Sequence, residues 1–163
     1  MLHAATDRIK ALLTRTFSWA ALSLLLNLAW EFAHLPLYTI WKDESAAGIA
    51  YAVMHCTAGD ALIAGATFLL TGAVLRDSDW VSSIPWRGGA IAVSLGLAYT
   101  VYSEWHNVYQ VGAWAYSPAM PLVFGIGLSP LLQWLVIPVS MMFILRARAG
   151  MWRRPQSNSS NPT

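Results

Sequence analysis

Residues 16–38 of this chain read TFSWAALSLLLNLAWEFAHLPLY. The run is long enough to cross a membrane, because a spanning helix needs about 20 mostly apolar residues. It carries one acid, Glu31, and no Lys or Arg. A charged side chain at the bilayer centre costs about 2.5–3.5 kcal/mol on insertion scales, so such residues usually face the interior of a helix bundle and serve a function. The stretch therefore predicts a membrane helix and, within it, a site.

The composition of the whole chain agrees with a membrane protein. Its 163 residues are 56% hydrophobic and 11% charged, which is too apolar for a soluble domain of this size. Three further runs are long enough to span, at 46–75, 88–109 and 122–145. We therefore predict an all-α fold, a four-helix transmembrane bundle over residues 16–145. A basic cytoplasmic or interfacial segment (1–15) precedes it, and a tail (146–163), first basic and then disordered, follows it.

The basic residues are distributed unevenly between the two sides of the predicted bundle. Nine of them lie before the first run, between the second and third, or after the fourth, whereas Lys42 alone lies on the other side. The positive-inside rule then predicts a bacterial inner-membrane protein with both termini in the cytoplasm and loops 39–45 and 110–121 outside. We expect the first helix to be uncleaved, because no small-residue cleavage site follows it. A net charge of +2 without a soluble basic face predicts no nucleic-acid partner, and the expected surroundings are the lipid bilayer.

Tryptophans and small residues give two further expectations. Tryptophans near both predicted boundaries resemble aromatic belts, with Trp30 and Trp134 lying deeper. The belt residues are Trp19, Trp80, Trp86 and Trp152 on the inner side and Trp41, Trp105 and Trp114 on the outer side. Gly48, Gly59, Gly65 and Gly72 predict that run 46–75 is approached closely by its neighbours. A large residue at Gly59 would then force the helices apart.

Polar side chains recur at helical spacing in the first two runs. Asn27, Glu31 and His34 follow the i, i+4, i+7 pattern and share one face. In run 46–75, Cys56 and Asp60 share a face, whereas His55 lies about 140° around the helix from Asp60. A single Cys cannot form an intramolecular disulfide.

The last two runs repeat this pattern. Thr100, Glu104 and Asn107 form one stripe, and His106, about 160° from Glu104, is expected at the outer interface. Gln133 lies near the middle of its run, between Pro130 and Pro138, which predict a kink and a polar cavity wall.

Depth joins these stripes into one hypothesis. With a rise of about 1.5 Å per residue, Glu31, Glu104 and His55 fall in the outer half of the bilayer, and Asp60 and Gln133 fall nearer its midplane. The shared depth predicts one pocket that opens outward, beneath an ordered aromatic loop at 110–121.

The first functional interpretation is acid–base chemistry on a lipophilic small molecule. Buried carboxyl groups and histidines can act as general acid and base when their surroundings differ. The expected catalytic residues are Glu31, Glu104, His55 and Asp60, and the expected substrate-binding residues are Asn27, Trp30, Asn107 and Gln133. A purely structural alternative is a set of hydrogen-bond clamps between helices, although an acid is a costly way to build one.

Two other classes of function stay open. In the second interpretation, His34, Glu31, His55 and Glu104 hold a Zn or Fe ion. The Glu-x-x-His spacing of di-metal bundles occurs once here, at Glu31 and His34, whereas those bundles carry it twice. Haem bound by two histidines has less support still. The third interpretation is a proton-coupled transporter or channel subunit that works as a homo-oligomer, although no internal repeat supports an inverted-repeat transporter. Roles for Cys56 and His106 are left open.

Four short segments together resemble a group of small bacterial inner-membrane proteins of uncharacterised activity. They are Trp30-Glu31-Phe32 through Leu35-Pro36-Leu37-Tyr38, His55-Cys56 with Gly59-Asp60, Ser103-Glu104-Trp105 with Asn107, and Trp114-Ala115-Tyr116 before Met120-Pro121. The resemblance covers most of the chain. It implies a four-span bundle and carries no activity over.

Overall fold

The computed structural model describes residues 2–152, and residues 153–163, with most of the expected disordered tail, lie outside the described part. The described chain is almost entirely helical, which confirms the all-α prediction. Its elements are α1 (Leu2–His34), the 3-10 turn η1 (Leu35–Leu37), α2 (Ile40–Asp43), α3 (Ala46–Leu75), α4 (Trp80–Ser83), α5 (Pro85–Trp105), the π-helical turn η2 (His106–Val111), β1 (Leu122–Val123), β2 (Ile126–Gly127) and α6 (Leu128–Trp152).

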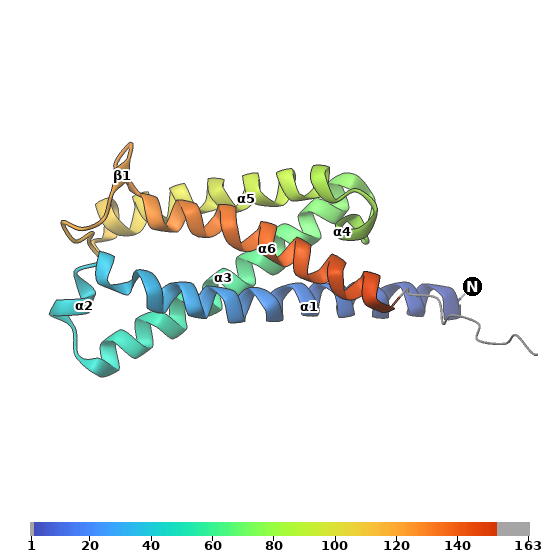
Figure 1. Ribbon diagram of the computed structural model, residues 1–163, viewed down its shortest axis with the longest axis horizontal. Coiled ribbons are helices and arrows are strands. Elements are labelled where there is room, and N and C mark those ends of the chain that lie inside the picture. Colours follow the sequence, from blue (N-terminus) through green and yellow to red (C-terminus); the bar gives the residue numbers. More distant parts are fainter. Residues whose placement is uncertain (1, 153–163) are drawn as a thin grey trace, which may run out of the picture.

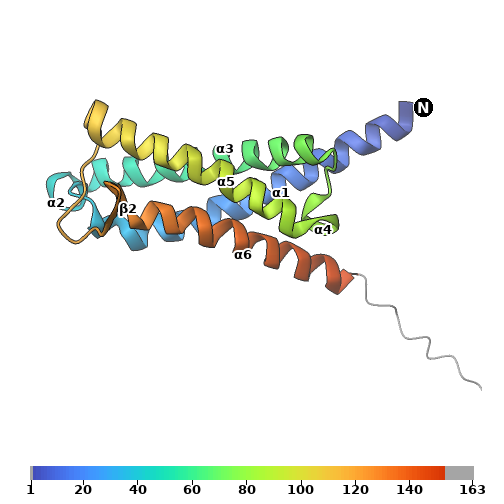
Figure 2. The ribbon, with the colours of Figure 1, turned by 90° about the horizontal axis from the view of Figure 1, so that it is seen from above.

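Four long helices, α1, α3, α5 and α6, lie side by side (Figures 1 and 2). α1 packs along α3 and α5 packs along α6, while contacts of α3 with α5 and of α1 with α6 close the bundle. α3 crosses the bundle obliquely, so its first half lies away from α5 (Figure 1). Within the described residues, three segments are long and apolar enough to cross a membrane: Ala5–Leu37, Ala46–Leu75 and Leu128–Arg148. α5, the expected third span, is not among them.

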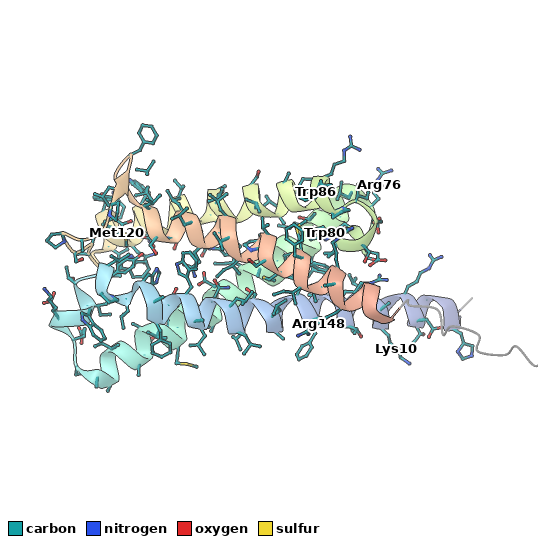
Figure 3. All side chains as sticks on the ribbon, in the orientation of Figure 1. Lys10, Arg76, Trp80, Trp86, Met120 and Arg148 are labelled. Carbon is teal, nitrogen blue, oxygen red and sulfur yellow. The ribbon has the colours of Figure 1, made fainter. Side chains whose placement is uncertain are left out.

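The two ends of the bundle differ in charge. Figure 3 shows Lys10, Arg76 and Arg148 toward one end, here called the basic end, and Met120 toward the other, here called the loop end. At the basic end Arg15 pairs with Asp79 at 3.3 Å. A hydrogen bond from the Ser83 hydroxyl, with a second from the backbone N–H of Asp79, lowers the pKa of the exposed Asp77 carboxyl. The Arg15–Asp79 pair joins α1 to the α3–α4 connection.

Trp19, Phe68 and Trp80 form an aromatic plug between the basic end and the middle of the bundle. Their ring centroids are 5.3–5.7 Å apart, and all three side chains are buried. The Trp80 indole N–H donates to the Phe68 carbonyl oxygen at 3.2 Å. The prediction that Trp19 and Trp80 belong to an interfacial belt was therefore wrong, because both rings are buried in the core. Trp86, Trp41 and Trp105 are exposed as belt residues should be.

Close approach of a neighbouring helix through glycine occurs on α5, whereas the glycines in the middle of α3 have open space beside them. A Cβ at Gly96 would lie 2.0 Å from Cε3 of Trp134, and one at Gly88 would lie 2.1 Å from Cε3 of Trp80. A Cβ at Gly59 or Gly65 would meet no atom within 4 Å. The prediction that Gly59 packs against a neighbouring helix was therefore wrong, since composition does not tell which face of a helix is covered.

Helix boundaries also differ from the predictions outside α3, whose predicted and observed ranges coincide. α1 starts at Leu2 and includes the basic segment. Residues 122–127 form a two-stranded hairpin and not the start of a span. Its turn places Phe124 and Gly125 at φ of 50° and 84°, as the tight turns of hairpins require. Pro130 consequently lies in the first turn of α6, where a helix tolerates proline, and Pro138 alone lies inside the helix.

Candidate functional site

A cavity of about 260 Å³ lies between the four long helices at the loop end. Its wall carries all three acids singled out from the sequence, Glu31, Asp60 and Glu104, together with His34 and His55. Glu31 and Glu104 are 8% and 7% exposed. The helices therefore bring the predicted acid and histidine side chains to one space.

Glu31 and His34 form one polar pair on α1. Because they lie one turn apart, the His34 Nε2 is 3.1 Å from Glu31 Oε2. The other ring nitrogen, Nδ1, is 3.0 Å from Ser129 Oγ at the start of α6. The Trp30 indole N–H donates to the same Ser129 oxygen at 3.2 Å. Trp30 thus positions Ser129, the hydrogen-bond partner of His34, and does not itself line the cavity.

Gln133 links the acids of α1 and α3. Its Nε2 lies 3.3 Å from Glu31 Oε1, 2.9 Å from Asp60 Oδ2 and 2.8 Å from Asn27 Oδ1. An amide nitrogen has two hydrogens, so these three acceptors share two donors. The two carboxyl groups are consequently close neighbours across the cavity wall.

Asn27 and Ser23 fix the orientation of the Gln133 amide. Asn27 Nδ2 donates to the Ser23 carbonyl oxygen at 2.9 Å and to Ser23 Oγ at 2.8 Å. A carbonyl only accepts, so Asn27 must present its oxygen to Gln133, and Gln133 must present its N–H groups to the acids. Asn27 is buried and lines a separate cavity of about 10 Å³ on the plug side of Gln133.

Glu104 is held by two tyrosines. Tyr116 donates its hydroxyl to Glu104 Oε2 at 2.6 Å, and Tyr38 donates to the same oxygen at 3.4 Å. Burial and the hydrogen bond to Glu104 raise the pKa of Tyr116 above its ordinary range, so this hydroxyl stays a donor. The buried indole N–H of Trp114 lies on the same cavity wall, toward the Glu104 carboxyl.

Backbone bonds fasten the loop that supplies Tyr116. Tyr38 and Tyr116 form an isolated antiparallel bridge. The Thr39 N–H donates to the Ala115 carbonyl and the Ser117 N–H donates to the Leu37 carbonyl, both at 2.9 Å. Loop 112–121 therefore lies over the end of α1 as an ordered structure and closes one end of the cavity.

The cavity reaches the surface of the bundle between α3 and α5. His55 is exposed and stacks on Tyr51 at 5.7 Å, and Tyr99 on α5 is 48% exposed, yet His55 and Tyr99 both line the cavity. Gly59 lies on the α3 side of this opening, where an added Cβ would meet nothing. His55 is thus a residue of the rim, and Asp60 lies one and a half turns deeper along α3.

The remaining predicted residues have varied positions. Asn107 lines the cavity and donates to the Ser103 carbonyl at 2.8 Å. Cys56 lines it too, whereas His106 stacks on Tyr102 at 5.8 Å and does not. Sequence reasoning missed Tyr38, Tyr99 and Ser129. Tyr38 follows the helix that carries Glu31, Tyr99 lies on the helix that carries Glu104, and Ser129 lies one turn before Gln133 on the same helix face, so the spacing could have pointed to all three.

The metal interpretation requires ligands close to one another. Within residues 2–152, no group of three or more His, Cys, Asp or Glu side chains is close enough to hold a metal ion. Glu31, His34, His55 and Glu104 line the same cavity but are spread around it. The alternative of a metal centre made of these four residues therefore stays a prediction, and a shared helix depth alone does not bring side chains to coordination distance. Both nitrogens of His34 are engaged, by Ser129 and Glu31, so haem ligation by this residue would break one of the two contacts.

The fold and the cavity define a helical protein whose apolar helices could span a membrane and whose interior holds Glu and His side chains. Comparisons with protein-family models, curated proteins and solved structures find no match for the chain.

Proposed function

We propose that the chain is a four-span protein of the bacterial inner membrane with both termini in the cytoplasm. α5 is then the third of four spans, because it packs against α3 and α6, two helices that are themselves apolar enough to cross. Glu104 and Thr100 of α5 are buried toward the bundle, so the lipid-facing surface of this helix is more apolar than the helix as a whole. The gathering of Lys10, Arg76 and Arg148 at the basic end supports a cytoplasmic location for that end (Figure 3).

We further propose that the cavity performs acid–base chemistry on a lipophilic molecule that enters from the bilayer. The observation that carries this proposal is that one cavity gathers three carboxyl groups and opens between α3 and α5. Exposed apolar side chains flank that opening, among them Tyr51, Met54 and Tyr102. A molecule dissolved in lipid could therefore reach the acids without crossing an aqueous phase.

The two walls of the cavity suit opposite proton transfers. On one wall, Glu31 with His34 accepts a proton from a carbon of the substrate, and Ser129 with Trp30 holds the imidazole in place. On the other, Glu104, aligned by Tyr116, returns a proton to a second carbon. One C–H bond breaks, a C=C bond shifts by one position and another C–H bond forms, so the net reaction is an isomerisation. The proton gained at Glu31 with His34 and the proton lost from Glu104 are then exchanged with water at the cavity opening, so no other co-reactant is needed. General acid and base groups of this kind contribute about 100-fold to 10,000-fold each.

The aromatic plug favours this function over a proton channel or transporter. Trp19, Phe68 and Trp80 fill the bundle on the cytoplasmic side of Asn27 with apolar rings. A conducting path would have to cross that layer. The carboxyl groups would therefore exchange protons through the outer end of the cavity or its lateral opening.

Solvent deuterium exchange tests the proposed chemistry without a known substrate. Purified protein is incubated in D2O with total lipid extract from a bacterial inner membrane, and mass spectrometry follows deuterium bound to carbon. We expect one lipophilic component to gain deuterium with the wild type and with Asp43→Asn, whose side chain lies outside the cavity. Glu31→Gln and Glu104→Gln should slow the exchange about 100-fold or more. Absence of any exchanging component, or equal exchange by Glu31→Gln, would refute the proposal.

A further inference from the structure

The acids that line the cavity have no permanent cation beside them among residues 2–152. Three carboxyl groups line it, and no Lys or Arg is among its lining residues. Within the described ranges the ion pairs are Arg15 with Asp79 and His34 with Glu31. Asp60 and Glu104 are therefore partnered by neutral donors, Gln133 and two tyrosines.

Hydrogen bonds from neutral donors do not offset the cost of burying an ionised carboxylate as an opposite charge would. Burying an ionised carboxylate without an opposite charge costs several kcal/mol, and a partner cation offsets that cost. The field of like charges adds up in a space with low-dielectric walls. An empty cavity of this kind favours a positively charged occupant and disfavours an anion.

Aromatic rings add to the same preference. Tyr38, Tyr99, Trp114 and Trp134 line the cavity together with the acids. Ring faces attract a cation within about 6 Å, by about 0.5–1 kcal/mol where exposed and about 2 kcal/mol where desolvated. The opening between α3 and α5 leaves room for an apolar body to extend into lipid beside exposed residues such as Leu62.

We infer that the cavity selects lipophilic organic cations, molecules that carry an ammonium or other positive centre on an apolar body. The inference rests on the proposed function, because it names the substrate class of the same site. The positive centre lies among Glu31, Asp60 and Glu104, and the apolar body leaves through the lateral opening. A substrate that develops positive charge on protonation is bound by the same groups.

Equilibrium dialysis with probes of matched length tests this selectivity. Radiolabelled decyltrimethylammonium is the cation, and unlabelled 1-decanol and decanoate are the neutral and anionic competitors. The protein is held in phosphatidylcholine nanodiscs, with empty nanodiscs as the blank. We expect saturable binding of about one cation per protein, which neither competitor displaces at equal concentration.

Variants then locate the charge. Glu31→Gln, Asp60→Asn and Glu104→Gln should each weaken cation binding about tenfold or more, as expected for the loss of one ion–ion attraction in a partly desolvated site, while Asp43→Asn binds as the wild type does. Displacement by 1-decanol or decanoate as effective as by the cation would overturn the inference even if no variant folded. Non-saturable binding would overturn it as well. Deuterium exchange without cation selectivity would leave the proposed function standing and refute this inference alone.

Discussion

Replacing Gly96 by Ala should destabilise the bundle, whereas the same replacement at Gly59 should not. Both glycines lie in the middle of long helices, so each substitution gains a similar helix propensity of about 1 kcal/mol. At Gly96 the new methyl group would lie 2.0 Å from Cε3 and 2.5 Å from Cζ3 of Trp134. The Trp134 ring is rigid and 5% exposed, so it cannot swing away. At Gly59 the methyl group meets nothing within 4 Å.

The difference between the two variants isolates the packing contribution. Overpacking a well-filled core costs about 1–3 kcal/mol, so Gly96→Ala should have a free energy of unfolding lower than Gly59→Ala by about that amount. Detergent-induced unfolding in bicelles, followed by tryptophan fluorescence, measures both. If Gly96→Ala were as stable as Gly59→Ala, α5 and α6 would not be in contact through Gly96. The positions of Trp134 and of the cavity wall would then be wrong as well.

Three further predictions concern the loop end, the basic end and the topology. Tyr116→Phe leaves Glu104 without its 2.6 Å hydrogen bond and should lower the free energy of unfolding by about 1–3 kcal/mol, measured in the same bicelles. Unchanged stability would contradict the hydrogen bond between Tyr116 and Glu104. The pKa of Asp77 is lowered on folding, so its charged form stabilises the fold above the unfolded-state pKa and the benefit is lost as pH falls through the folded-state value. Asp77→Asn should therefore reduce stability at pH 7 and make no difference in strong acid, and a pH-independent effect would be the opposite result. In a Cys56→Ser background, an impermeant maleimide should label Asp43→Cys in spheroplasts and label Ser78→Cys only after lysis; labelling of both before lysis would reverse the topology.

The sequence predicts helices well where apolar runs are bounded by polar residues. Run 46–75 is flanked by Lys42 to Ser45 and by Arg76 to Asp79, and α3 has these limits. The hairpin at 122–127 was missed because a short apolar run does not distinguish a strand from a helix. The pair Phe124-Gly125 was the local sign of its turn.

The site was predictable in composition but not in connectivity. Spacing along α1 was sufficient to pair Glu31 with His34, since both lie on one helix. The bonds of Glu104 to Tyr116 and of Gln133 to Asp60 depend on how a loop and two helices lie in space, and periodicity says nothing about either. The sequence likewise does not show the surroundings of Gly59, because a small residue can lie on a cavity wall as readily as in a contact between helices.

Labelling with dicyclohexylcarbodiimide tests most directly whether three carboxyl groups lie in a cavity that is open to lipid. This reagent partitions into bilayers and modifies carboxyl groups in apolar surroundings. Peptide mass spectrometry should find adducts on Glu31, Asp60 and Glu104 and none on Asp43, which lies outside the cavity. Gly59→Leu, which fills open space on the cavity wall, should fold normally and lose the adducts. Adducts confined to Asp43 and other loop acids, or labelling unaffected by Gly59→Leu, would contradict a cavity open to the bilayer.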